Sequence, residues 1–565
     1  MRKRAVALFL AATGCAQPSH FESPLAVTAD RATSAPALII DRALRKQHIT
    51  GFGASSAWTG GSISPATADL FFDVDRGLGL SLLRMHIAPD GTTSETNTAK
   101  LAVARGVKVW AAPWSPPGEW KTSGTDTNGG SLLPEHYQDW ADRLTAFVNS
   151  QSAAGVPLMA LSAQNEPNWK ATWESCVYSA ADLTTFVRDY LAPTIARDCP
   201  GVKVLTPETI DWNTLSGFAG PLLADPASAA AVDIVAVHDY GGVPFAYTAP
   251  ADNGKEFWET EVSYDDQDGV LAALETAVQI HRHLTTGSVN AFHYWWLIGD
   301  ASSGGGLLVD GALVPQAYAL GHYSKFVRPG YVRLDVPAEP ASGVSTSAYV
   351  DPDSGRIVIV AVNENTSAVD LGLHFAGTPP VALVPWLTTA DVSLTAQATV
   401  AVSDPLSYSL PAQSITTLVT SDDLAPSDSG EGGQANQPDE SAGMSAAGAS
   451  GAAGEVSIPM GSGGSSTQGS GGTGSTRPGH GGTTSGPRGG SGGSAGTTSE
   501  GGANDELDAG VEDGGARHVP GKYYACLCRL PGGDRGHGAE ALPVVALVAV
   551  LAGRRRSRAA RIARR

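Results

Sequence analysis

Eight short apolar segments, separated by helical patterns, constrain the fold of this chain more than its composition does. The segments are Gly51–Ser55, Leu80–His86, Val107–Ala112, Pro157–Ala163, Val202–Thr206, Val232–His238, Phe257–Glu261 and Asn290–Leu297. Between them, apolar residues recur three or four positions apart, as at Tyr137, Trp140 and Leu144, which is the spacing of one helix face. The alternation predicts an α/β protein, and eight strands favour an eight-fold β/α (TIM) barrel over an open sheet.

A second domain is predicted after the barrel, because the helical spacing disappears there. We take residues 37–325 as the barrel domain and residues 326–421 as a side β-sandwich, and we expect the apolar run Ala37–Asp41 to join the sandwich. β-Branched residues dominate its expected strands. These strands are Arg356–Val362, Val381–Val384, Val392–Val402 and Ser414–Val419.

Both ends of the chain carry the patterns of an exported protein. A basic start and an apolar core make residues 1–15 a predicted secretory signal peptide, followed by a loose leader over residues 16–36. Cys15 closes a stretch similar to a bacterial lipobox, but Ala12 stands where that motif prefers Leu. We therefore expect simple secretion rather than lipidation of Cys15.

The last part of the chain is predicted to be a linker and an address. Residues 422–518 are rich in Gly, Ser and Thr, and such a stretch cannot bury enough apolar surface to fold, so a disordered linker is expected. Residues 519–565 hold Cys526 and Cys528, an apolar run too short for a membrane span of ~20 residues, and an Arg cluster. The combination is similar to the C-terminal sorting signals of myxobacterial surface proteins. We expect the protein to be secreted, or to be anchored at the membrane or the bacterial outer surface through this tail.

Charge and cysteine content exclude some partners. The formal net charge is −19, so a polyanionic nucleic acid is an unfavourable partner. In an exported chain, Cys176 and Cys199 are expected to form a disulfide. They have no Cys or His companions at metal spacing, so we predict no metal site.

Two glutamates at strand ends supply the predicted chemistry. Glu166 follows an apolar strand, and Pro167 forbids further ladder pairing, so this carboxylate lies at the strand end. Three glutamates lie in the expected seventh strand. Alternation puts Glu259 and Glu261 on one face, with Glu256 opposite. Glu261 is nearer the C-terminal strand end, where barrel sites lie, and is predicted to pair with Glu166; no partner is predicted for Glu259.

Nine short motifs, spread over about residues 37–421, carry a resemblance to a known family. They are Gly51–Ala54, Leu80–His86, Ala112–Pro117, Asn165–Pro167, His238–Gly241, Trp258–Glu261, Trp295-Trp296, Ser324–Tyr331 and Pro411–Ser414. In this order they resemble glycoside hydrolase family 30, most closely its bacterial endo-xylanase branch. The resemblance implies a monomeric, retaining endo-glycosidase that hydrolyses β-1,4-xylan, a plant cell-wall polysaccharide, with no cofactor.

The resemblance also implies a role for each candidate residue. Glu166 would give its proton to the leaving sugar oxygen and then act as a base, while Glu261 attacks the anomeric carbon. Asn165 is suited to bond the sugar 2-hydroxyl, and Arg84 to orient Glu261 by a charge-assisted hydrogen bond. The other substrate-binding candidates are Trp114, His238, Tyr240 and Trp296.

Several of these residues also have a structural interpretation. Arg84 could be an ion pair, Trp114 and Trp296 could be core, and His238 could be a satisfied strand-end histidine. Glu208, at another strand end, fits either substrate contact or structural pairing. Two other functions stay open: a β-1,6-galactanase or β-1,6-glucanase of the same family, and a non-catalytic surface carbohydrate-binding protein.

The branch of the family that is specific for glucuronoxylan holds a methylglucuronate side chain with one Arg and two Tyr. Those three positions are occupied here by Asp300, Ser302 and Ser263. An Asp in place of the Arg would repel a uronate, which discriminates against it. The sequence therefore predicts cleavage of xylan without a requirement for glucuronate side chains.

Overall fold

The computed structural model describes residues 36–59, 61–264, 267–299 and 305–421. The expected signal peptide, Gly/Ser-rich linker and sorting tail lie outside these ranges. Among the helices within them, none is long and apolar enough to cross a membrane.

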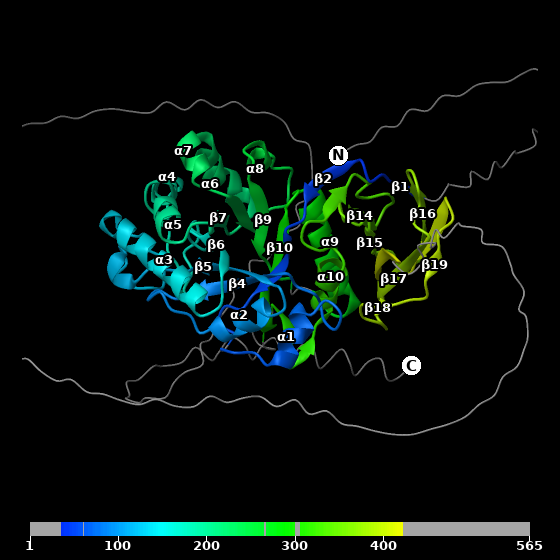
Figure 1. The fold of residues 1–565 in the computed structure, drawn as a ribbon, viewed down its shortest axis with the longest axis horizontal. Helices are drawn as coiled ribbons and strands as arrows, with labels where there is room; N and C mark the ends of the chain where they lie inside the picture. The colour runs from blue at the N-terminus through cyan, green and yellow to red at the C-terminus, as the bar shows by residue number, and fades with distance from the viewer. Residues whose placement is uncertain (1–35, 60, 265–266, 300–304, 422–565) are drawn as a thin grey trace, which may run out of the picture. The chain divides into compact units, whose positions relative to one another are not determined.

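Eight parallel strands close into a barrel, as predicted (Figure 1). They are β3 (Gly51–Ser55), β4 (Leu82–Ile87), β5 (Lys108–Pro113), β6 (Leu158–Ser162), β7 (Lys203–Thr209), β8 (Ile234–His238), β9 (Glu256–Glu261) and β10 (Ala291–Gly299). Ala291 of β10 pairs with Trp258 of β9 on one side and with Gly51 of β3 on the other, which closes the ring. A short hairpin, β11 (Gly306–Val309) and β12 (Ala312–Leu313), continues from β10.

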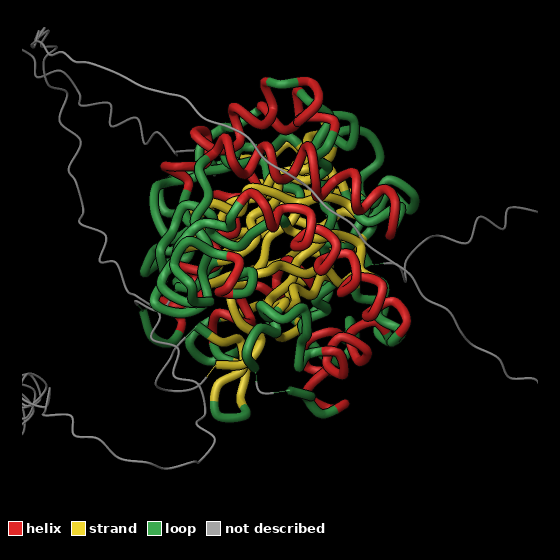
Figure 2. The backbone as a smooth tube through the Cα atoms, turned by 90° about the vertical axis from the view of Figure 1, so that its left-hand side faces the viewer, coloured by secondary structure: helices red, strands yellow, loops and turns green. Residues whose placement is uncertain are grey.

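Helices surround the strands, which occupy the middle of the view in Figure 2. The α-helices are α1 (Pro65–Phe72), α2 (Thr96–Val103), α3 (Tyr137–Ala153), α4 (Ala180–Thr185), α5 (Ala192–Asp198), α6 (Trp212–Ala224), α7 (Pro226–Ala230), α8 (Ala249–Asp252), α9 (Val270–Thr285) and α10 (Pro315–Ser324). Shorter 3-10 turns and one π-helical segment are η1 (Gly118–Trp120), η2 (Pro134–His136) and η3 (Phe186–Leu191). The apolar face expected from Tyr137, Trp140 and Leu144 is the buried face of α3.

Buried side chains from its strands occupy the interior of the barrel. Small and large residues alternate there, with Ala160 and Ala236 beside Trp110 and Trp258. The Trp110 indole N–H donates to His293 Nε2 at 3.0 Å. Chemistry in this barrel is therefore confined to its mouth.

The side domain is a β-sandwich of two sheets. One sheet has the order β18-β17-β21-β15-β14-β13-β2, with β19 beside β17, and the other is β1-β16-β20. The strands are β1 (Ala37–Ile40), β2 (Arg45–His48), β13 (Val332–Leu334), β14 (Val344–Val350), β15 (Ile357–Asn363), β16 (Val369–Phe375), β17 (Ala382–Thr388), β18 (Thr395–Ala396), β19 (Val400–Ala401), β20 (Leu406–Leu410) and β21 (Ser414–Thr420). The first strand, β1, pairs with β16 in this domain.

The larger sheet of the sandwich packs against two helices of the barrel. In β15, Val358 and Val360 join the core that continues into the barrel helices, whereas Ile357 and Ile359 join the core of the sandwich. Burial on both faces explains the unbroken apolar run of this strand. Helices α9 and α10 lie between the two domains (Figure 1).

The expected disulfide between Cys176 and Cys199 is wrong, because both thiols are free and buried. A continuous helical run from Ala180 to Asp198 separates them. At about 1.5 Å per residue this run is about 28 Å long, whereas a disulfide needs the two Cα atoms within about 7 Å. Apolar residues at helical spacing, such as Leu183, Phe186 and Val187, indicate this helix in the sequence, and its length excludes the pairing.

Candidate active site

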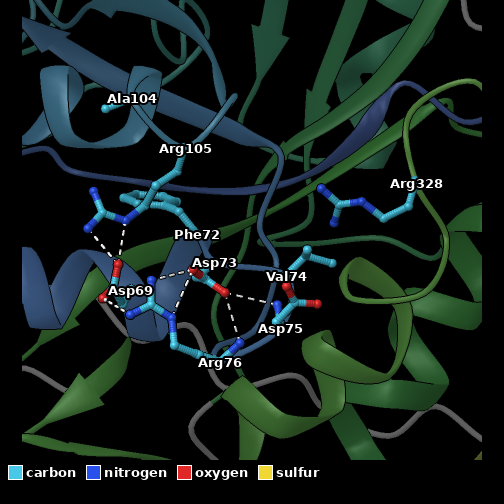
Figure 3. A pocket seen from close by; sticks show the side chains of 9 residues that line it. All are labelled: Asp69, Phe72, Asp73, Val74, Asp75, Arg76, Ala104, Arg105 and Arg328. Carbon is cyan, nitrogen blue, oxygen red and sulfur yellow. Dashed lines mark hydrogen bonds and ion pairs between the residues drawn. The ribbon is translucent and has the colours of Figure 1, made fainter. Parts of the chain in front are cut away.

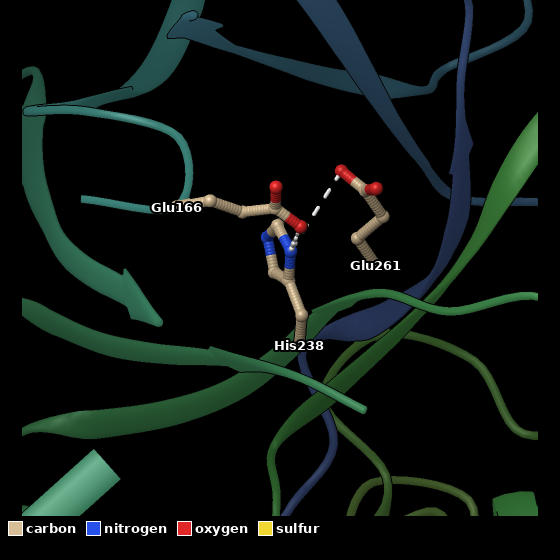
Figure 4. Close-up of side chains that lie close together, drawn as sticks. All are labelled: Glu166, His238 and Glu261. Atoms are coloured by element: carbon tan, nitrogen blue, oxygen red, sulfur yellow. Dashed lines mark hydrogen bonds and ion pairs between the residues drawn. The ribbon is translucent and has the colours of Figure 1, made fainter. Parts of the chain in front are cut away.

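Glu166 and Glu261 converge at the barrel mouth, as Figure 4 shows, and His238 lies beside both. Glu166 follows β6, and its backbone has φ 46°, a left-handed conformation that costs a non-glycine residue about 1 kcal/mol or more. His238 ends β8 and Glu261 ends β9. The His238 Nδ1 atom lies 3.1 Å from Glu166 Oε1 and 3.9 Å from Glu261 Oε2.

Arg84 is the fully buried centre of this group. Its Nη1 donates to Glu261 Oε2. Its Nη2 donates to Asn165 Oδ1 at 2.6 Å and to Glu208 Oε1 at 2.9 Å. The guanidinium also lies 4.5 Å from the ring centre of Trp114. One rigid cation thus fixes the orientation of side chains from three other strand ends.

Tyr240 completes the surroundings of Glu261. Its hydroxyl donates to Glu261 Oε1 at 2.9 Å, so both oxygens of this carboxylate accept a hydrogen bond. The structure therefore brings together six predicted residues: Arg84, Asn165, Glu166, His238, Tyr240 and Glu261. Their roles toward a substrate stay predictions.

The electrostatics of the group depend on its three carboxylates. Burial is the main cause that raises the pKa of Glu166, and the charge of Glu261 raises it further. Burial alone would lower the pKa of His238, but the surrounding carboxylates raise it to about 10. At neutral pH His238 is therefore a cation, which donates to Glu166 and also to Glu208 at 3.4 Å.

Glu208 is a structural counter-charge rather than an exposed substrate contact. Its side chain is fully buried, and it accepts hydrogen bonds from Arg84, His238 and Ser162. Burial raises the pKa of Glu208, but the charge of Arg84 and these hydrogen bonds outweigh it, so that the pKa is lowered. Three carboxylates and two cations leave one negative charge in excess, and a proton on Glu166 neutralises it.

Aromatic side chains form one wall of the mouth. The ring centres of Trp58 and Trp114 are 5.1 Å apart, and Trp295 lies 6.0 Å from Trp114. Trp295 stacks on Trp296, whose indole N–H donates to Ala57 O at 2.6 Å. Trp114 and Trp296, predicted as sugar-binding residues, thus belong to one aromatic cluster with Trp58 and Trp295.

Trp58, His86 and Trp169 were missed by the sequence reasoning. Trp58 lies three positions past the end of β3, and His86 lies near the end of β4, 4.8 Å from Trp58 between ring centres. Trp169, three positions after Glu166, keeps 41% of its surface exposed. Trp58 follows the strand segment Gly51–Ser55 and His86 ends the segment Leu80–His86, so aromatic side chains at strand ends are the signal that could have found these two.

Glu259 does not share the face of Glu261, contrary to the expectation from alternation. A bulge separates the two residues: Val237 pairs with Glu259, whereas His238 pairs with Glu261. The side chain of Val237 belongs to the core outside the barrel. Because paired residues of neighbouring strands point to the same side of the sheet, the side chain of Glu259 also points out of the barrel. Its oxygens accept main-chain hydrogen bonds within the sheet.

Among the described residues, one group has a spacing that could suit a metal ion: the ligand atoms of Glu166, His238 and Glu261 lie within 4.8 Å of one another. The charges do not suit a metal cation. His238 is itself a cation that donates from both nitrogens, and Arg84 already neutralises Glu261. We therefore derive no chemical step through a metal.

A surface cavity of about 520 Å³ lies at the other end of the barrel, where β4 and β5 begin (Figure 3). Four of its charged groups pair with one another: Arg76 contacts Asp69 at 2.8 Å and Asp73 at 2.6 Å, and Arg105 contacts Asp69 at 2.5 Å. These side chains are held in ion pairs, whereas the barrel mouth brings two buried carboxylates together. The barrel mouth is therefore the candidate active site.

Of the three residues that replace the glucuronate clamp, Ser263 lies within the described residues, whereas Asp300 and Ser302 lie outside them. Ser263 is partly exposed, two positions after Glu261. A Cβ atom at Gly305 would lie 3.5 Å from Ser263 Cβ and 3.4 Å from Trp295. Ser263 thus borders the aromatic wall.

Comparison with known proteins gives a consistent result for both domains. Residues 95–256 match the model of the glycosyl hydrolase family 30 TIM-barrel domain, and residues 330–418 match that of the family 30 beta sandwich domain. The chain is 32% identical to the glucuronoxylanase XynC of Bacillus subtilis over 391 residues, which cover 66% of this chain and 89% of that protein.

Two solved structures are similar at comparable identity. A family 30 subfamily 8 xylanase of Clostridium acetobutylicum is 32% identical, with a TM-score of 0.63, and the match covers 68% of this chain and 99% of that one. An endoxylanase of Clostridium papyrosolvens is 31% identical, with a TM-score of 0.60 and the same coverage.

Proposed function

The chain belongs to glycoside hydrolase family 30, and we propose that it is a retaining endo-xylanase that cleaves β-1,4-xylan without requiring glucuronate side chains. The observation that carries the proposed reaction is the carboxylate pair. Ligand oxygens of Glu166 and Glu261 lie within 4.8 Å of each other. Double displacement uses carboxyl groups about 5–5.5 Å apart, whereas inverting enzymes need about 6.5–9.5 Å to admit a water.

Glu166 is the proposed general acid and base. Burial raises the pKa of Glu166, which keeps its proton available for the leaving sugar oxygen. His238 is a cation that donates to Glu166 Oε1 at 3.1 Å, and this bond leaves Oε2 to hold the proton that is transferred. After the leaving group departs, the same carboxylate accepts a proton from the incoming water.

Glu261 is the proposed nucleophile. Arg84 and Tyr240 each donate to one of its oxygens, which fixes the carboxylate for attack on the anomeric carbon. The side-chain oxygen of Asn165, Oδ1, accepts a hydrogen bond from Arg84 at 2.6 Å. Its amide nitrogen is then the atom that can donate to the sugar 2-hydroxyl, a bond that strengthens in the transition state.

The substrate proposal combines the relatives with the altered clamp. Two similar structures are named as xylanases, which supports a xylan backbone. One similar protein is named a glucuronoxylanase, but this chain has Asp300, Ser302 and Ser263 where that specificity uses an Arg and two Tyr. An acidic residue in place of a bidentate Arg converts attraction of a uronate into repulsion.

Location is a separate proposal. The tail with Cys526, Cys528 and an Arg cluster supports display of the enzyme at the bacterial outer surface. Residues 422–518 would then tether the catalytic domains to that surface.

Product analysis on pure polysaccharides tests the proposed substrate. The panel contains linear xylan, arabinoxylan, glucuronoxylan, β-1,6-glucan and β-1,6-galactan, with the Glu261→Gln chain as the blank. We expect linear xylan and arabinoxylan to be cut at least as well as glucuronoxylan. Strict dependence on glucuronate would refute the specificity, and cleavage of only the β-1,6-linked polymers would refute the xylan assignment.

A further inference from the structure

A carboxylate with no part in the proposed proton transfers lies directly behind the nucleophile. Glu259 is fully buried. Its Oε1 accepts a hydrogen bond from the backbone N–H of Glu261 at 3.0 Å, and its Oε2 accepts one from the backbone N–H of His293 at 3.0 Å. The side chain of Glu259 thus joins the main chain of β9, at the nucleophile, to the main chain of β10.

The bond from His293 bridges a gap in the hydrogen-bond ladder between β9 and β10, for which one residue pair, Ala291 with Trp258, is regular. The Asn290 N–H donates to Phe257 O at 2.6 Å, and the Trp295 N–H donates to Val262 O at 2.7 Å. Between these points, the His293 N–H reaches the Glu259 carboxylate instead of a backbone carbonyl. The side chain of Glu259 therefore links β9 to β10 at the level of the nucleophile.

The bulge on the other side of β9 is what turns the nucleophile inward. Trp258 points into the barrel, so strict alternation would put Thr260 inside and Glu261 outside. Thr260 is the extra residue of the bulge, and a bulge reverses the faces of the residues that follow it. Glu261 can meet Arg84 and Tyr240 only because of this irregularity.

We propose that Glu259 is a positioning residue that holds this bulge and thereby fixes Glu261 in its attacking geometry. The proposal deepens the proposed function and rests on Glu261 being the nucleophile. What the site needs from Glu259 is two acceptor oxygens at the full length of a Glu side chain. Gln offers one oxygen and one NH2 group, which would face a backbone N–H, and Asp is too short to reach both strands.

Burial agrees with a role based on acceptors rather than on charge. It raises the pKa of Glu259 well above its usual range, although the two main-chain N–H groups oppose the rise. A carboxyl in either protonation state keeps both oxygens, whereas an amide does not.

The test uses three variants of the full chain: Glu259→Gln, Glu259→Asp and, as a matched control, Glu256→Gln. Glu256 is on the same strand, and it accepts hydrogen bonds from Lys203 at 2.7 Å, the Trp258 indole N–H at 2.8 Å and the Thr50 hydroxyl at 2.5 Å, away from the nucleophile. An activated 2-deoxy-2-fluoro-xylobioside traps the glycosyl-enzyme on the nucleophile. The rate of trapping, the inhibitor affinity, kcat, KM and Tm are measured for each variant.

We expect both Glu259 variants to lower kcat and the trapping rate roughly 10- to 100-fold, with KM and inhibitor affinity near wild type, because misplacement of a reacting group by ~1 Å has this effect. Glu256→Gln should change the trapping rate by less than about twofold, whatever its Tm. The Asp variant decides the outcome if the Gln variant fails to fold.

Two results would overturn the inference in different ways. If a folded Glu259 variant is trapped at the wild-type rate and only its Tm falls, Glu259 is merely structural and the proposed function stands. If the wild-type chain forms no covalent label on Glu261, the nucleophile assignment fails, and the inference fails with it.

Discussion

His322 should make the stability of this enzyme fall in weak acid, because it is buried between the barrel and the sandwich. Its ring nitrogens lie 2.9 Å from Thr417 Oγ1 and 2.8 Å from Thr388 Oγ1. The Thr417 hydroxyl donates to the His322 carbonyl, so it accepts from Nδ1, and Thr388 donates to Nε2. The ring is thus held as a neutral tautomer.

The magnitude follows from the pKa of this ring. Burial lowers the pKa of His322 from 6.5 to about 3, so the folded chain resists a proton that the unfolded chain takes up. The contribution of this ring to the free energy of unfolding is complete above its pKa in the unfolded chain. It decreases as the pH falls from that value toward the pKa of the ring in the folded chain. Between pH 8 and pH 5 the loss amounts to about 2 kcal/mol.

Urea unfolding of the full chain at pH 8 and pH 5 measures this loss. The His322→Gln variant keeps one donor and one acceptor but cannot titrate, so its stability should fall by about 2 kcal/mol less than that of the wild type over this interval. His374→Gln, at an exposed position of β16, is the control and should keep the wild-type difference. Equal pH dependence of His322→Gln and wild type would refute the reasoning.

Four other outcomes are expected. His238→Asn removes a cation that opposes the raised pKa of Glu166, so the basic limb of the kcat/KM profile should move to higher pH; a limb that stays in place or moves down contradicts this. Arg84→Lys keeps the charge, but its single nitrogen cannot take the places of both Nη1 and Nη2, so kcat on xylo-oligosaccharides should fall roughly 100-fold; a wild-type kcat would show that Arg84 does not orient the nucleophile. A chain ending at Lys325 exposes the apolar faces of α9 and α10 and should be insoluble; soluble, active barrel would show that the sandwich is dispensable. Deletion of the residues after Pro520 should release active enzyme into the medium, and unchanged cell association would mean that another segment is the anchor.

The barrel could be predicted from the sequence because its strands are buried on both faces. Each reads as a compact apolar run, and the polar residues that end these runs, such as Glu166, mark the mouth. The sandwich was predicted less completely. In β16 polar and apolar residues alternate over Val369–Phe375, so no apolar run marks it. The run Val392–Val402 holds two short strands rather than one, and Leu394 within it has φ 43°.

The site was predictable where it depends on strand ends and was not where it depends on local irregularity. Periodicity assumes regular alternation, so it placed Glu259 beside Glu261 and could not foresee the bulge at Thr260. The pairing of the two cysteines in an exported chain likewise suggested a disulfide between Cys176 and Cys199, although a long helical run separates them. The first error comes from a local irregularity that periodicity does not encode. The second does not, because apolar residues at helical spacing, such as Leu183, Phe186 and Val187, indicate the intervening helix in the sequence.

Azide rescue of the two carboxylate variants tests the central claim most directly. With an activated β-xyloside, azide replaces water in Glu166→Ala after the glycosyl-enzyme has formed, and attacks directly in Glu261→Ala, where no glycosyl-enzyme forms. The configuration of the glycosyl azide is read by NMR. The account predicts the β-azide from Glu166→Ala and the α-azide from Glu261→Ala. The same anomer from both variants, or the reverse assignment, would contradict it.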